Sequence, residues 1–62
     1  MAYLVVDEYL NEWIYDISPV RDDETGTWEV RHEDTWFIQL PKGTIEKITG
    51  KKLTWKDEPH HI

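Results

Sequence analysis

Apolar and polar side chains alternate along several short segments in the first forty residues. A β-branched apolar run covers residues 2–6, and alternation follows over 12–17, 28–32 and 35–40. A period of two places successive side chains on opposite faces of a strand. The pattern therefore predicts four antiparallel strands, each with one face toward a core and one toward solvent.

Turn-forming residues separate these segments. A polar turn is expected over 7–11, and Glu33-Asp34 forms a tight connection. Residues 18–26 contain Pro19 and Gly26 among several acids, a composition typical of an irregular loop. The four strands should therefore follow one another as a meander.

The periodicity changes after residue 40. Pro41-Lys42-Gly43 ends the last alternating segment, and Ile45 and Ile48 then lie three positions apart. This spacing predicts at most two helical turns, with Thr44 as the N-cap and Gly50 as the end of the helix.

The remaining residues predict one further strand and a free end. Leu53-Thr54-Trp55 is short and apolar enough to form a last strand, whereas residues 57–62 are polar and contain Pro59. We therefore expect a single small β domain over 1–56 and a frayed polar tail over 57–62.

Two mainly β architectures fit this order of elements. One is a small SH3-like barrel, and the other is a four- or five-stranded antiparallel sheet with one short helix before the last strand. The chain resembles SH3-like barrels in element order and size. The acidic and aromatic motifs of peptide-binding SH3 domains are not recognisable, so the resemblance implies no binding residues.

A second resemblance concerns the C-terminal third of the chain. The segment Leu40-Pro41-Lys42-Gly43-Thr44-Ile45-Glu46-Lys47-Ile48-Thr49-Gly50, then Leu53-Thr54-Trp55 and Asp57-Glu58-Pro59, carries it. These residues resemble small uncharacterised proteins of bacteriophages and other mobile elements. The resemblance implies a genomic context and no catalytic residues.

The composition indicates which residues form the core and how charge is distributed along the chain. Four Trp, three Tyr and one Phe in 62 residues supply most of the expected core, since the chain has no cysteine for a disulfide. Thirteen acids against seven bases give a net charge of −6, and residues 1–40 alone carry ten acids and two arginines. This balance argues against direct binding of nucleic acid or anionic lipid.

Candidate chemistry is sparse. The single serine, Ser18, precedes a proline without a nucleophile elbow, and His60-His61 lies in the expected mobile tail. A domain this small has little room for a catalytic pocket. We therefore expect no enzyme activity, no cofactor and no metal site. The absence of a signal peptide or a long apolar run predicts a cytoplasmic protein.

The acidic surface is the feature that suggests a function. Fixed carboxylates on a small sheet can imitate a row of phosphates and steer the protein toward a basic groove on another protein. We expect a binding module that docks on a basic nucleic-acid-binding or defence protein, in the manner of a phage inhibitor. The alternative is a self-associating structural module that uses exposed strand edges. The expected partner-binding residues are Glu12, Asp16, Asp22, Asp23, Glu24, Glu29 and Asp34, with Phe37 as an apolar anchor.

Overall fold

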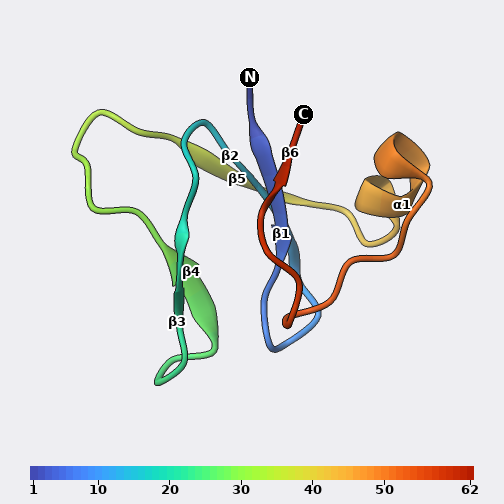
Figure 1. Cartoon of the computed structure of the whole chain (residues 1–62), viewed down its shortest axis with the longest axis horizontal. Helices are drawn as coiled ribbons and strands as arrows, with labels where there is room; N and C mark the ends of the chain where they lie inside the picture. Colours follow the sequence, from blue (N-terminus) through green and yellow to red (C-terminus); the bar gives the residue numbers. More distant parts are fainter.

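The computed structural model describes residues 1–62 and contains six short strands and one helix (Figure 1). Four strands form an antiparallel sheet in the order β5-β2-β1-β6, and β3 and β4 form a separate antiparallel hairpin. The sheets do not close on themselves, so the mainly β fold class is confirmed and the barrel is not. The elements are β1 (Tyr3–Val6), β2 (Glu12–Tyr15), β3 (Val20–Asp22), β4 (Thr27–Glu29), β5 (Phe37–Leu40), α1 (Thr44–Thr49) and β6 (His60–His61).

The four-stranded sheet carries an apolar cluster on each face. Figure 1 shows α1 on one side of the sheet and the β3–β4 hairpin on the other. The buried members are Leu4, Val6 and Ile45 on the helix side, and Val5, Tyr15 and Trp28 on the hairpin side. The prediction of one solvent-facing side is therefore wrong for β1, because both of its faces meet an apolar neighbour.

The loop expected over 18–26 contains a strand that the sequence analysis missed. Residues of β3 pair with β4 in the register Val20 to Glu29 and Asp22 to Thr27. The turn closes where the Gly26 amide donates to the Asp22 carbonyl at 2.9 Å, and Gly26 adopts φ +73°. The turn-forming residues thus make a hairpin rather than an irregular loop.

The last strand lies further along the chain than predicted. Leu53-Thr54-Trp55 is not a strand; Leu53 packs on the helix-side cluster and Trp55 on the hairpin-side cluster. This segment therefore passes from one face of the sheet to the other instead of pairing with it.

The expectation of a frayed end is also wrong, because the C-terminus is paired with the N-terminus. His60 and His61 form β6 against Leu4 and Tyr3. The amide of Ile62 donates to the Ala2 carbonyl at 2.8 Å, and the ring of His61 stacks on Tyr3 at 4.6 Å. A polar sequence here still forms a strand, since edge pairing needs only backbone donors and acceptors.

Candidate interaction surface

The β3–β4 hairpin gathers four of the expected acidic residues. Asp22 lies on β3, Asp23 and Glu24 follow it in the turn, and Glu29 lies on β4. All four line one shallow hollow, together with Val20, Arg21 and Arg31. The local turn fixes this arrangement, because the Asp22 carboxylate accepts the amide of Glu24 at 3.0 Å.

The carboxyl groups of Asp22 and Glu29 influence each other's titration. The side-chain hydrogen bond to Asp22 raises the pKa of Glu29, and the charge of Asp22 raises it further. The same hydrogen bond lowers the pKa of Asp22, helped by the backbone amide of Glu24. The hairpin thus holds two carboxylates close enough to repel each other when both are ionised.

Arg21 does not relieve this repulsion, because its guanidinium is engaged elsewhere. It lies 4.8 Å from the ring centre of Trp28 and 5.1 Å from that of Trp55. Its Nη2 donates to the carbonyls of Trp55 and Asp57 at 2.9 and 3.0 Å. These contacts of Arg21 attach the hairpin to the C-terminal segment. The carboxylates of the hairpin are directed toward solvent.

Phe37 lies next to the acidic hairpin. Its ring stacks on Tyr15 at a centroid distance of 5.2 Å, and the residue is 51% exposed. A second shallow hollow brings Phe37 together with Glu29, Trp28 and Val30. Glu29 is among the residues that line both hollows. We call Asp22, Asp23, Glu24, Glu29 and Phe37 the hairpin face.

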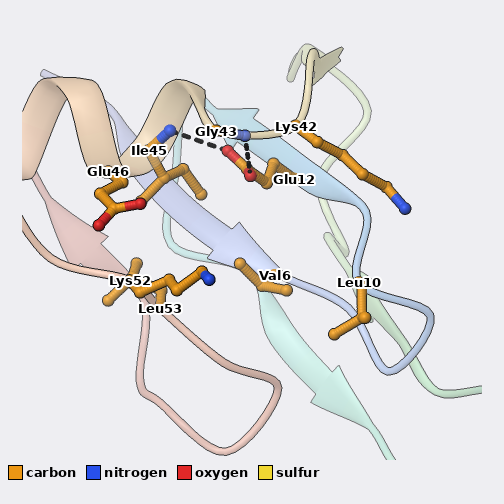
Figure 2. Close-up of a pocket in the computed structure, with 9 residues that line it drawn as sticks. All are labelled: Val6, Leu10, Glu12, Lys42, Gly43, Ile45, Glu46, Lys52 and Leu53. Atoms are coloured by element: carbon orange, nitrogen blue, oxygen red, sulfur yellow. Dashed lines mark hydrogen bonds between the residues drawn. The ribbon is translucent and has the colours of Figure 1, made fainter.

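Glu12 is not part of the hairpin face. It lies on the helix side of the sheet, where its two carboxylate oxygens accept the amides of Gly43 at 2.6 Å and Ile45 at 2.8 Å (Figure 2). Thr44, the expected N-cap, instead donates its hydroxyl to the Pro41 carbonyl at 2.6 Å. Gly43 occupies the N-cap with φ 95° and has no capping side chain, so Glu12 supplies the acceptors from β2.

The other two expected acids are also separate from the hairpin face. The Asp16 carboxylate accepts the amide of Trp36 at 3.1 Å and fixes the start of the β5 segment. Asp34 is exposed in the loop between β4 and β5, in a hollow shared with Ile17 and His32. The alternation of β2 placed Glu12 and Asp16 on one face, but it could not show that backbone donors occupy both carboxylates.

A hollow of about 220 Å³ lies beside Glu12. Figure 2 shows Val6, Leu10 and Leu53 lining it, together with Lys42 and Lys52. Both oxygens of Glu12 already accept backbone amides there. The carboxylate at this hollow therefore caps the start of α1.

The structure brings no three His, Asp or Glu side chains together in a geometry that could hold a metal ion. None of its helices has the length and apolar character needed to span a membrane.

Trp36 and Ile38 are more exposed than the alternation over 35–40 predicts. That alternation puts Trp36, Ile38 and Leu40 on one face of the strand, expected to be the core-facing one, but Trp36 and Ile38 are 48% and 57% exposed. Alternation identifies residues that share a face of a strand, and it does not show whether anything covers that face at the edge of a sheet.

Comparison with protein-family models, curated protein sequences and solved structures found no match to the chain. The resemblances to phage proteins and to SH3-like barrels therefore stay predictions.

Proposed function

We propose that this chain is a non-enzymatic binding module that docks its hairpin face on a basic surface of another protein. The observation that carries the proposal is the grouping of Asp22, Asp23, Glu24 and Glu29 around one hollow. Arg31 is the cation beside them, while Arg21 is directed to the C-terminal segment. A basic partner would bind these carboxylates through charge-assisted hydrogen bonds and relieve their mutual repulsion.

The anchoring of the hairpin supports a docking role. Trp28 donates its indole Nε1–H to the Val6 carbonyl at 2.9 Å, and the Tyr15 hydroxyl donates to the Trp28 carbonyl at 3.2 Å. These buried bonds join β4 to the central sheet. A surface that is already ordered loses little conformational entropy on binding, which favours affinity.

Phe37 gives the proposed surface an apolar anchor. Aromatic side chains at the centre of an interface contribute much of its binding energy, whereas exposed charges mainly set the association rate. Phe37 adjoins Glu29, so a partner that pairs with the carboxylates would also cover the ring.

The partner that fits best is a protein whose own ligand is a polyanion. A groove lined with Lys and Arg for nucleic acid would accept a rigid row of carboxylates in place of phosphates. The resemblance of the C-terminal third to mobile-element proteins favours a host nucleic-acid-binding or defence protein as the target. The chain would inhibit such a target by occupying its groove.

Affinity capture from the native cell, followed by mass spectrometry, tests this proposal. The wild-type chain should capture a basic protein. The variant Asp23→Lys/Glu24→Lys should lose it, because two exposed carboxylates of the hairpin face are reversed. The matched control Glu33→Lys/Glu46→Lys changes the net charge by the same amount at exposed sites outside the hairpin face, and it should retain the partner.

Two results would contradict the proposal. One is capture of a partner that the hairpin variant retains as well as the wild type does. The other is equal loss from the hairpin variant and the control, which would mean that total charge matters and the hairpin does not.

A further inference from the structure

The strand β5 is a free edge of the four-stranded sheet. It pairs with β2 on one side and has no strand on the other. Its sequence, Phe-Ile-Gln-Leu, has no charge, and Phe37 and Ile38 are both more than half exposed. Natural sheets usually protect such an edge with lysine, proline or a bulge, because an unprotected edge recruits another strand.

The ladder shows which backbone groups of β5 are available. The Asp16 amide donates to the Trp36 carbonyl at 3.2 Å, so residues 16 and 36 form a hydrogen-bonded pair. Such pairs alternate along an antiparallel ladder, and Ile14 therefore forms the next one with Ile38. The amides and carbonyls of Phe37 and Gln39 consequently point away from β2, toward the open edge.

We propose that the β5 edge pairs antiparallel with β5 of a second copy of this chain. Phe37 of each copy would exchange hydrogen bonds with Gln39 of the other, which makes the strand complementary to itself. The two-fold axis then passes between the two Ile38 residues, a non-hydrogen-bonded pair in which side chains lie closest. This pairing uses the backbone edge of β5, which shares Phe37 with the hairpin face but contains none of its carboxylates, and it does not depend on the proposed function.

Exposed apolar side chains fit the same register. Trp36 of one copy lies opposite Leu40 of the other, so the apolar positions of the two strands meet across the axis. The register therefore covers Trp36 and Ile38, which are 48% and 57% exposed in the single chain.

The strand at the opposite edge of the sheet, β6, is less suited to pairing with a second chain. The strand β6 has two residues, both histidine, and it follows Pro59. A strand this short presents few backbone groups to a partner. Pairing through β5 uses the same surface on both copies, so the assembly closes at two chains.

Sedimentation equilibrium tests the pairing. The wild type should shift from 7.5 kDa toward twice that mass as its concentration rises. Ile38→Lys places two lysines opposite each other at the axis and should weaken the dimer at least about tenfold. Ile48→Lys is the matched control, because Ile48 is 52% exposed on α1 and lies away from β5; it should dimerise as the wild type does.

Amide hydrogen exchange gives a second readout on the unmodified chain. Exchange of the Phe37 and Gln39 amides should slow as the concentration rises, whereas the Ile38 amide is already bonded to β2 and should change little. A wild type that stays at 7.5 kDa, or that exchanges Phe37 and Gln39 equally fast at all concentrations, overturns the proposal. A mass that keeps growing beyond two chains also overturns it.

Added salt should strengthen this dimer by screening the charge of −6 on each copy, and it should weaken docking on a basic partner, so the two proposals fail separately.

Discussion

At the scale of single residues, several carboxylates organise the backbone instead of the surface. Asp7 is buried, and it accepts the amides of Tyr9 and Asn11 at 2.9 Å and the indole Nε1–H of Trp13 at 3.0 Å. It thereby fixes the β1–β2 turn, in which Leu10 adopts φ 68°. The Glu12 carboxylate likewise accepts a backbone amide at the start of α1. The Asp16 carboxylate accepts one at the residue that precedes β5. An acidic composition therefore overstates the charge available for binding.

Glu12→Gln should lower the free energy of unfolding by about 1–2 kcal/mol. A glutamine offers one oxygen, so its amide nitrogen would face one of the two backbone N–H groups that Glu12 now satisfies. Urea denaturation measures the loss. Glu33→Gln removes an exposed carboxylate of the β4–β5 loop and should change stability by less than about 0.5 kcal/mol. Equal effects of the two substitutions would contradict the capping role of Glu12.

The alkaline limit of stability should depend on Tyr15. Burial raises the pKa of Tyr15 above its usual 10.0, and the charge of Asp7 raises it further. The folded state thus favours the neutral phenol, so its contribution is complete below pH 10.0 and is lost as the pH rises through the raised pKa. Urea midpoints measured across this range should fall for the wild type.

The variant Tyr15→Phe distinguishes the ionisation of Tyr15 from that of the other groups that titrate at alkaline pH. The variant should lose about 1 kcal/mol at neutral pH, because the hydrogen bond to the Trp28 carbonyl is removed. Its stability should then decline less steeply than that of the wild type above pH 10.0. Parallel declines in the two proteins would show that Tyr15 does not ionise at a cost to the fold.

At the scale of elements, the sequence predicts those that local pattern determines. The alternation around Trp13 and Phe37 identifies β2 and β5, and the spacing of Ile45 and Ile48 with Gly50 identifies α1. It misses β3 and β6, where partners distant in sequence decide the outcome. His60 and His61 form a strand because β1 presents a free edge, and no local property of these residues indicates that.

The candidate surface was predictable only in part for the same reason. The run of acids at residues 22–24 marks an exposed turn. The structure places Glu29 in the same hollow, and Phe37 in a second hollow that Glu29 also lines. Sequence could not show that Glu12 and Asp16 bind backbone amides, nor that the Arg21 guanidinium stacks on Trp28 and Trp55. These contacts join residues up to 34 positions apart.

The hairpin should be sensitive to substitution of Gly26. A Cβ at this position would lie 2.7 Å from the Glu8 carboxylate and 2.9 Å from the Glu8 Cβ, in addition to the strain of φ +73°. Gly26→Ala should therefore cost at least about 2 kcal/mol of folding free energy.

Gly50 provides the control for backbone strain alone. It has a similar φ of +75°, and a Cβ there would have no neighbour within 4 Å. Gly50→Ala should cost about 1 kcal/mol, measured by the same urea denaturation. If both alanine variants lose the same stability, the close approach of Glu8 to the hairpin turn is not important.

At the scale of the whole molecule, charge is separated along the structure. The acidic hairpin and α1 lie on opposite sides of the central sheet (Figure 1). Lysines lie within or next to α1, at positions 42, 47, 51 and 52, whereas residues 1–40 hold ten of the thirteen acids. In the proposed docking, this separation would orient the molecule in the field of a basic partner and direct the hairpin face toward it.

Affinity for the captured partner, measured over a series of salt concentrations, tests the central claim most directly. The wild type should lose affinity steadily as salt rises. Asp23→Lys/Glu24→Lys should bind at least about tenfold more weakly at low salt, and Glu33→Lys/Glu46→Lys should follow the wild type. An affinity that does not change with salt, or equal weakening by the two charge-matched variants, would contradict docking through the hairpin face.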